Sequence, residues 1–229
     1  MTRLGIIGGI GPETSCMFCL NVNNKVIEKT NVQPSIIMEN IPMPESTLNK
    51  LAHGEKPQLV LELLSKSVST LNSINSDVIA IPCNTVHVFI DQLRAISNVP
   101  IVSIIEESAK ECEKRDFKRV GLISSTTSVK EGLHSKELEK RNISCIFPTE
   151  SQQDEISKII VKIIRNVVKE NDVRFIRSII SDLKDKGADS IMLACTDIRT
   201  IISEKDTPLP IVETTTALEN AVAKLLIKQ

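Results

Sequence analysis

Two stretches of similar design, Ile79-Ala80-Ile81-Pro82-Cys83-Asn84-Thr85 and Ile191-Met192-Leu193-Ala194-Cys195-Thr196-Asp197, decide the fold that we expect. Each is an apolar run of strand length that ends on a cysteine, with a hydroxyl residue directly after it or one position beyond. A thiol at such a strand end faces the first amide groups of the next helix, whose dipole stabilises a thiolate. Because the two stretches occupy similar places in the two halves of the chain, we predict that Cys83 and Cys195 meet across a cleft.

Apolar runs of strand length alternate with helix-length segments along the whole chain. This alternation is typical of parallel β/α units. Pro12 suits a first helical turn and Pro57 opens another helix, whereas 41–47 reads as a Pro-rich loop. We expect strands at 4–8, 35–39, 77–81, 100–103, 119–123, 143–147, 190–194 and 210–212, and helices at 13–29, from 57, 84–96, 104–115, 128–141, 150–168, 173–186 and 214–226.

The two halves also resemble each other in layout. Gly5-Ile6-Ile7-Gly8 heads the first half and Gly121-Leu122-Ile123-Ser124 heads the second, and each precedes its cysteine by a similar length of chain. We predict two similar α/β lobes of about 100 residues each, with the last strand and helix crossing back to the first lobe. The predicted boundaries are 1–98 plus 208–229 for the first lobe and 99–207 for the second. A cleft is expected where the strand ends of the two lobes face each other.

Composition excludes several classes of partner. Lys and Arg number 28 against 29 Asp and Glu, so the charge balance does not indicate a nucleic-acid or membrane partner. The absence of Trp and Tyr removes the stacking surfaces that are used on single-stranded nucleic acids. No run approaches the ~18 apolar residues of a membrane-spanning helix, and the first residues do not form a signal peptide. We therefore predict a cytoplasmic protein whose six cysteines are free thiols.

Two short motifs invite readings that their spacing does not support. Gly8-Gly9-Ile10-Gly11-Pro12 follows a strand, but Thr14 stands where a dinucleotide-binding motif would place its third glycine. We expect a tight turn whose backbone approaches a small anionic ligand at a helix N-terminus, with a plain strand–helix turn as the alternative. Cys16-Met17-Phe18-Cys19 lies a full turn inside a helix, so we predict buried core thiols and no metal or redox site.

Two similar thiols that face one small substrate suit inversion at a carbon acid. One side chain removes a proton from one face of the α-carbon while the other donates a proton to the opposite face. Asn84, Thr85 and Thr196 supply groups for the substrate carboxylate, where negative charge grows as the proton leaves. Two alternatives stay open: buried cysteines without a catalytic role, and a Cys83–His87 dyad for acyl transfer, since the two residues are one helical turn apart.

At these motifs the sequence resembles the aspartate/glutamate racemase superfamily, and within it the aspartate racemase branch. The glycine turn with Glu13-Thr14-Ser15 is close to the opening G-G-M-G-P-x-A-T of that branch. Pro82-Cys83-Asn84-Thr85-Val86-His87 matches its P-C-N-T-A-H, and Ala194-Cys195-Thr196-Asp197 corresponds to its G/A-C-T-E. Ser125-Thr126-Thr127-Ser128 occupies the place of its T-T-G-T segment, so the resemblance covers essentially the whole chain.

The resemblance implies two pseudo-symmetric α/β lobes, each a four-stranded parallel sheet flanked by helices, with the active site in the cleft between them. It also implies a homodimer that racemises an amino acid without pyridoxal phosphate, metal or another cofactor. Cys83 and Cys195 are the acid/base pair that it implies. The residues that we predict to bind the substrate are Ile10, Gly11, Ser46, Asn84, Thr85, Thr126, Lys158 and Thr196.

The substrate side chain is the point at which this sequence departs from the branch. Aspartate-specific relatives grip the side-chain carboxylate with an arginine in an I-P-D-R-T loop and a lysine in the second lobe. Here Ser46 stands at the arginine position and Lys158 at the lysine position. The loss of one cation predicts a relaxed pocket for aspartate, a related acidic substrate or a broader set. A thiol-dependent isomerase of a small dicarboxylate and a non-catalytic ligand-binding relative stay open as alternatives.

Overall fold

The computed structural model describes residues 2–228, and their eight strands form two separate four-stranded sheets. The first sheet has the order β2-β1-β3-β4 and the second has the order β6-β5-β7-β8. Every neighbouring pair of strands is parallel, which confirms the predicted α/β fold with two four-stranded lobes. The strands are β1 (Arg3–Gly8), β2 (Ser35–Asn40), β3 (Val78–Ala80), β4 (Ile101–Val102), β5 (Arg119–Ser124), β6 (Ser144–Ile146), β7 (Ser190–Ala194) and β8 (Ile211–Glu213).

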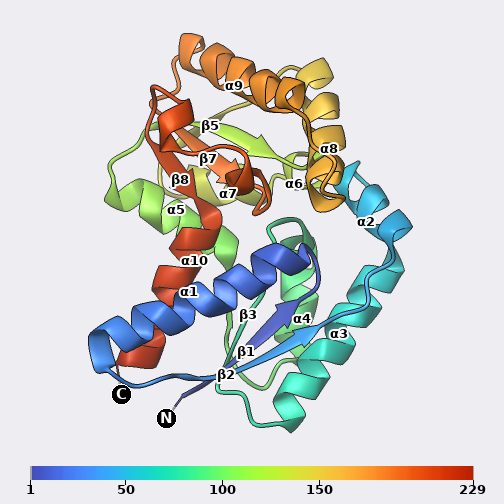
Figure 1. Cartoon of the computed structure of the whole chain (residues 1–229), viewed down its shortest axis with the longest axis vertical. Helices are drawn as coiled ribbons and strands as arrows, with labels where there is room; N and C mark the ends of the chain where they lie inside the picture. Colours follow the sequence, from blue (N-terminus) through green and yellow to red (C-terminus); the bar gives the residue numbers. More distant parts are fainter. Residues whose placement is uncertain (1, 229) are drawn as a thin grey trace.

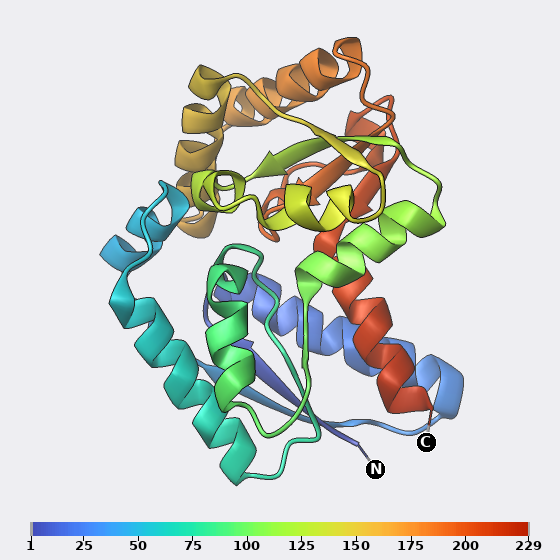
Figure 2. The same cartoon turned by 180° about the vertical axis from the view of Figure 1, so that it is seen from behind.

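Helices and short 3-10 turns connect these strands and cover the faces of both sheets (Figure 1). The view from behind in Figure 2 shows the two lobes one above the other, with helices from both lobes meeting at the level between the sheets. The helices are α1 (Pro12–Thr30), α2 (Glu45–Ala52), α3 (Gln58–Ser73), α4 (Ile90–Ile96), α5 (Ile104–Lys114), α6 (Thr126–Lys130), α7 (Leu133–Glu139), α8 (Glu150–Ile164), α9 (Glu170–Asp185) and α10 (Thr214–Ile227). The 3-10 turns are η1 (Thr85–Phe89), η2 (Ile198–Thr200) and η3 (Glu204–Asp206).

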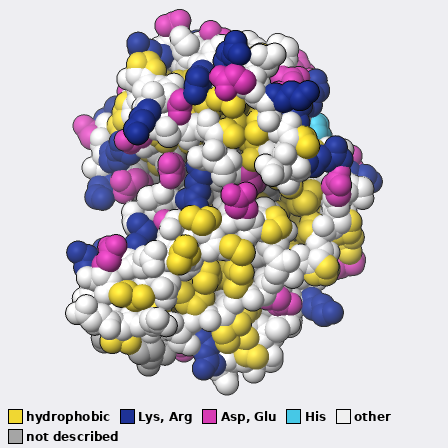
Figure 3. Space-filling view, in the orientation of Figure 1, with side chains coloured by type: hydrophobic (Ala, Val, Ile, Leu, Met, Phe, Trp, Pro, Cys, Tyr) yellow, Lys and Arg dark blue, Asp and Glu magenta, His cyan; other side chains and the backbone are white. Residues whose placement is uncertain are grey.

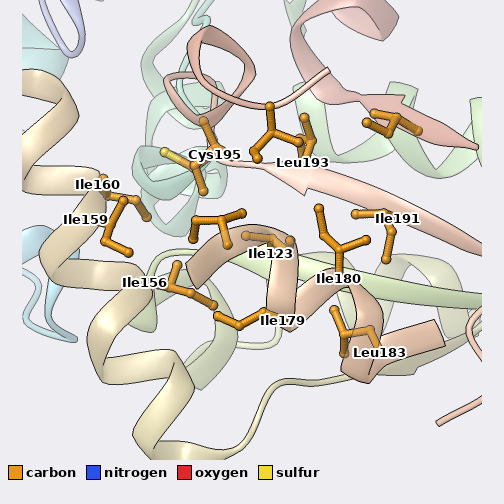
Figure 4. Close-up of a cluster of buried hydrophobic side chains, with 14 of the residues drawn as sticks. Ile123, Ile156, Ile159, Ile160, Ile179, Ile180, Leu183, Ile191, Leu193 and Cys195 are labelled. Atoms are coloured by element: carbon orange, nitrogen blue, oxygen red, sulfur yellow. The ribbon is translucent and has the colours of Figure 1, made fainter. Parts of the chain in front are cut away.

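The core of the second lobe is almost entirely aliphatic. Figure 4 shows isoleucine and leucine side chains of β5, β7, α8 and α9 packed together, with Cys195 at one end of the cluster. The buried positions of α8 include Ile156, Ile159 and Ile160, a spacing that places them on one face of the helix. Cys195, which follows β7, is therefore anchored in a close-packed core and is only 7% exposed.

The closing helix α10 joins the two lobes. It follows β8 of the second sheet and packs against α1 and α5. Its residues Leu218 and Val222 share a buried cluster with Leu4 and Ile6 of β1 and Phe18 of α1. The last helix thus contributes to the core of the first lobe, as the sequence led us to expect.

Two strands pair differently from the predicted lobe boundaries. Strand β8 pairs with β7 in the second sheet, although 208–229 was assigned to the first lobe. Strand β4 pairs with β3 in the first sheet, although 99–207 was assigned to the second. The physical reason is that consecutive strands tend to pair in one sheet, and the chain passes between the lobes through α5 and α10. Whether the lobes are independent domains stays a prediction.

Three local expectations also differ from the structure. A helix was predicted over 128–141, but Gly132, with φ of 65°, separates α6 from α7. The segment predicted as a Pro-rich loop runs directly into α2, which begins after Pro44. Cys16 is exposed and Cys19 is half-buried, so the prediction of two buried core thiols is wrong. The buried face of α1 follows Thr14, Phe18 and Val22 instead.

The surface carries charges of both signs. Figure 3 shows basic and acidic side chains interspersed, while apolar side chains gather over the first lobe in the lower half of the view. Exposed apolar residues of that lobe include Met17 and Leu20 on α1. In residues 2–228 we find no helix that combines the length and the apolar character needed to span a bilayer.

Candidate active site

A small cavity lies between the two lobes at the carboxyl ends of their strands. From the first lobe it is lined by Ile10, Leu48, Leu51, Ala52, Cys83, Asn84 and Thr85. From the second lobe it is lined by Ser125, Ile160, Ile164, Cys195, Thr196 and Asp197. The cavity volume is about 30 Å³, counted as the space open to the centre of a water molecule, which leaves room for roughly two waters. The cavity therefore brings both predicted thiols to one place, which is narrow and partly open to solvent.

The two thiols have the same local geometry. Cys83 follows β3, and the backbone amides of Thr85 and Val86 hydrogen-bond its sulfur. Cys195 follows β7, and the backbone amides of Asp197 and Ile198 do the same. In each case the donors are the amides two and three residues beyond the cysteine, at the start of η1 or η2. These amides favour the thiolate, which is the property predicted from the sequence.

Burial opposes the amides and dominates. Desolvation raises the pKa of the Cys83 thiol to about 12, with the amides of Val86 and Thr85 lowering it and the Asp197 carboxyl raising it. Desolvation also raises the pKa of the Cys195 thiol well above its usual value, and the nearby Asp197 and Cys83 add to that effect. Both shifts favour the protonated thiols at neutral pH. One of them becomes a base only when a positive charge or solvent enters beside it.

Asp197 is a buried carboxyl group whose place in the site was not predicted from its motif. Burial raises its pKa, while a hydrogen bond from Thr14 Oγ1 to Asp197 Oδ1 at 2.7 Å lowers it. The Cys195 thiol lies 4.0 Å from Asp197 Oδ2 and donates toward it. Gly11 carries φ of 82°, and a Cβ there would come within 2.6 Å of Asp197 Oδ1. The glycine turn thus leaves space for this carboxyl group.

Asn84 is held by a buried polar chain that connects the two strand ends. Its Nδ2 donates to Thr214 Oγ1 at 2.9 Å, and Thr214 Oγ1 donates to the carbonyl of Leu193 at 3.1 Å. Its Oδ1 accepts from His134 Nε2 at 3.1 Å. Burial lowers the pKa of His134 to about 3, so the ring is neutral and donates through one nitrogen only. The chain fixes Asn84 between β3 and β7, beside both thiols.

Two further contacts tie the lobes together at the cavity. Thr85 Oγ1 lies 2.8 Å from Ser125 Oγ, so hydroxyl groups of the two lobes share a hydrogen bond. Glu219 of α10 pairs with Arg199 of η2 at 3.2 Å and accepts from Asn21 of α1. Because η2 directly follows Asp197, this buried pair braces the loop that carries Cys195 and Asp197.

His87 does not reach the thiol of Cys83. The backbone N–H of Ile104 donates to His87 Nε2 at 3.3 Å, so Nδ1 carries the proton and donates to the carbonyl of Cys83 at 2.8 Å. Burial lowers the pKa of His87 to about 4. Both ring nitrogens are thus used by the backbone, and the Cys83–His87 dyad that the spacing allowed is not formed here.

Some of the other predicted substrate-binding residues line the cavity or lie beside it, and the rest are exposed or bonded elsewhere. Ile10 and Thr196 line the cavity beside Asn84 and Thr85, whereas Gly11 lies at its edge as the N-cap of α1. Thr126 is buried next to Ser125, but its hydroxyl shares a 2.8 Å hydrogen bond with Ser157. Ser46 is exposed on α2. Lys158 is exposed on α8 and pairs with Glu155 at 3.0 Å. Their substrate contacts stay predictions.

Sequence reasoning missed the aliphatic wall of the cavity. Leu48 and Leu51 come from α2, which was read as part of a loop region, and Ile160 and Ile164 come from α8. The available signal for α2 was Pro44 followed by an acidic residue and apolar residues three apart, which is a helix start. Among residues 2–228, no three or more His, Cys, Asp and Glu side chains are grouped so that they could bind a metal ion.

Comparison with known proteins agrees with this architecture. The family model described as Asp/Glu/Hydantoin racemase matches residues 7–222. The chain belongs to this racemase family. Among curated relatives, the broad specificity amino-acid racemase RacX of Bacillus subtilis (strain 168) is 22% identical over 223 residues, which is 94% of either chain.

Solved structures of other family members share the fold. The aspartate racemase of Picrophilus torridus superposes with a TM-score of 0.83 at 25% identity, covering 100% of this chain and 96% of that one. A glutamate racemase from Francisella tularensis in complex with D-glutamate gives a TM-score of 0.69 at 15% identity, covering 99% of this chain and 81% of that one. This racemase is therefore similar over its whole length to proteins named for amino-acid racemisation.

Proposed function

We propose that this family member racemises an α-amino acid without a cofactor, by two-base proton transfer between Cys83 and Cys195. The single observation that carries the proposal is the cavity itself: one thiol from each lobe lines it, and each is held by the amides two and three residues beyond. Such a matched pair has a clear use in a reaction whose product is the mirror image of its substrate. A hydrolase or a single-base enzyme needs only one of the two.

The proton transfers balance without an outside reagent. In one direction the Cys83 thiolate takes the α-proton, the C–H bond breaks, and its electron pair delocalises into the substrate carboxylate. The Cys195 S–H then donates its proton to the opposite face of the α-carbon. Cys83 is left as the thiol and Cys195 as the thiolate, so the same steps in reverse convert the second enantiomer.

The charge that develops on the carboxylate is matched by the polar side of the cavity. Asn84, Thr85, Ser125 and Thr196 all line it and carry hydrogen-bond donors. Donors that are already oriented stabilise the enolate-like transition state at little reorganisation cost. The substrate ammonium group brings the positive charge that a buried thiol requires, because an adjacent cation lowers a thiol pKa.

The test is α-proton exchange in heavy water, combined with chiral chromatography of the products. We expect Cys83→Ser and Cys195→Ser each to lower racemisation by at least about 100-fold, since positioned acid/base groups contribute that much or more. The exposed Cys16→Ser, on α1 and outside the cavity lining, is the matched control and should keep wild-type activity. Racemisation by either active-site variant within about tenfold of wild type would contradict the two-base proposal.

A further inference from the structure

The cavity has a polar side and an aliphatic side. The thiols and the donors described above occupy the polar side, where the α-carbon, carboxylate and ammonium group of a substrate find their partners. The remaining lining consists of Ile10, Leu48, Leu51, Ala52, Ile160 and Ile164. An amino acid whose α-carbon lies between the two thiols therefore directs its side chain toward aliphatic residues.

The aliphatic side is built by two helices from different lobes. Leu48, Leu51 and Ala52 are spaced three and four residues apart on α2 and share one face. Ile160 and Ile164 are four residues apart on α8 and face them. The two helices are in contact, and Figures 1 and 2 both show α2 of the first lobe beside α8 of the second.

No cation faces the cavity from this side. Among the described residues that line it, none is Lys or Arg. Lys158 is exposed and paired with Glu155, and Ser46 is also exposed. Arg165 follows Ile164 but forms an ion pair with Glu45 on the outer rim, where both side chains are more than half exposed. The side-chain carboxylate of aspartate or glutamate would thus be desolvated without a partner.

Asp197 adds a second penalty for an acidic substrate. It is the carboxyl group in the cavity lining, and burial already raises its pKa. The side-chain carboxylate of a dicarboxylic substrate adds a further negative charge to a small volume that already holds Asp197 and the substrate α-carboxylate, so like-charge repulsion is larger than for an aliphatic substrate. The same surroundings favour an alkyl side chain, because burying apolar surface against leucine and isoleucine is stabilising.

We propose that the substrate of this site is a neutral α-amino acid with an aliphatic side chain, and that dicarboxylic amino acids are poor substrates. This specificity rests on the proposed racemase function. The cavity is small, so an alkyl side chain fits only when α2 moves away from α8. Leu48, Leu51, Ile160 and Ile164 are its specificity-determining residues.

The first experiment compares kcat/KM for L-leucine, L-valine, L-methionine and L-alanine with that for L-aspartate and L-glutamate. We expect the best aliphatic substrate to exceed both dicarboxylic ones by at least about 100-fold, because an unpaired buried charge is costly. Equal or higher kcat/KM for aspartate overturns the proposal. So does a loss of aspartate turnover in Arg165→Gln, which would mean that Arg165 binds a side-chain carboxylate.

The second experiment places a cation in the aliphatic wall. In Leu48→Arg we expect kcat/KM for aspartate to rise at least about tenfold and that for leucine to fall, since an arginine pairs with a carboxylate. Val167→Arg, at an exposed residue just beyond α8, adds the same charge outside the cavity and should change neither value. An equal response of the two variants overturns the assignment of the wall.

Calorimetric titration of wild-type protein with L-leucine and L-aspartate separates this inference from the racemase function. Tighter binding of leucine without α-proton exchange supports the aliphatic site and refutes racemisation. Exchange with aspartate as the preferred ligand does the reverse. Binding of neither amino acid overturns the aliphatic site as well.

Discussion

Glu219→Gln tests whether the loop after Cys195 depends on an ion pair that spans the lobes. Glu219 is 2% exposed on α10, and its carboxylate pairs with Arg199 of η2 at 3.2 Å and lies 3.9 Å from Lys25. Glutamine keeps the shape and one hydrogen-bond acceptor for Asn21 but removes the charge. The change leaves the Arg199 guanidinium, with its side chain only 14% exposed, without its carboxylate.

The expected cost follows from this burial. Removing one partner of a fully buried pair costs about 3–5 kcal/mol. Arg199 keeps some solvent contact, and glutamine retains part of the hydrogen bonding, so we expect about 2–3 kcal/mol. For a protein of this size that corresponds to a fall in Tm of roughly 5–10 °C. Because η2 directly follows Asp197, we also expect a lower kcat for racemisation.

The assay is urea unfolding of the wild type, Glu219→Gln, Arg199→Gln and the double variant. The double-mutant cycle isolates the coupling between the two side chains, which should exceed about 1 kcal/mol. Glu111→Gln is the matched control, because its pair with Lys114 is exposed on α5 and should contribute at most about 1 kcal/mol. A Glu219→Gln variant within about 0.5 kcal/mol of wild type, or a coupling near zero, would refute the bracing role.

Three further outcomes are expected. Burial raises the pKa of Cys83 to about 12, so the fraction of thiolate grows tenfold with each pH unit below that value. We therefore expect log kcat/KM to rise with a slope near 1 from about pH 6.5 to 8.5. A plateau in that range would exclude a buried thiol as the base. His134 stays neutral in the fold down to about pH 3 while the unfolded chain is protonated below about 6.5, so this residue should contribute a loss of about 3 kcal/mol on acidification to pH 4. In urea titrations His134→Gln should therefore lose about 3 kcal/mol less than the wild type over that range, and His87, whose pKa is about 4, accounts for part of the loss that remains. Gly11→Ala should destabilise the protein by more than about 2 kcal/mol, because φ is 82° and the new Cβ meets Asp197 Oδ1. In the control Gly132→Ala the new Cβ meets only flexible side-chain atoms, so the loss should be smaller. Equal free energies of unfolding for the two variants would contradict this.

Much of the fold could be predicted from the repeated pattern of an apolar strand followed by a cysteine motif. Parallel β/α units and their approximate bounds follow from the alternation of apolar runs and helix-length segments, and the two sheets confirm that pattern. Strand β8 pairs in the second sheet although its range was predicted for the first lobe, because periodicity identifies a strand but not the sheet edge that it joins. Only three residues of β8 pair with β7, so the choice depends on tertiary contacts and not on local pattern.

Site residues that directly follow a strand could be predicted from the sequence, whereas those on helices could not. Cys83 and Cys195 line one cavity because each follows a strand of its own sheet and the carboxyl ends of the two sheets face each other. Leu48 and Ile164 were not predicted, since an aliphatic residue on an amphipathic helix gives the same pattern whether it faces a core or a ligand. Asp197 was visible in its motif, but its contact with Thr14 crosses 183 residues of sequence and required the fold.

The two thiols of the cavity have unequal surroundings. Asp197 lies within hydrogen-bond distance of Cys195, whereas the corresponding place after Cys83 is taken by Thr85, whose hydroxyl contacts Ser125. The carboxyl group therefore opposes thiolate formation more strongly at Cys195 than at Cys83. The two enantiomers of a free amino acid have equal free energies, so the ratio of their kcat/KM values equals 1 whatever the difference between the thiols. The difference between the thiols can therefore change kcat and KM only together: the direction with the lower KM also has the proportionally lower kcat. Under the proposed two-base mechanism we therefore expect Asp197 to determine which enantiomer is bound more tightly and turned over more slowly, while the equilibrium stays unchanged.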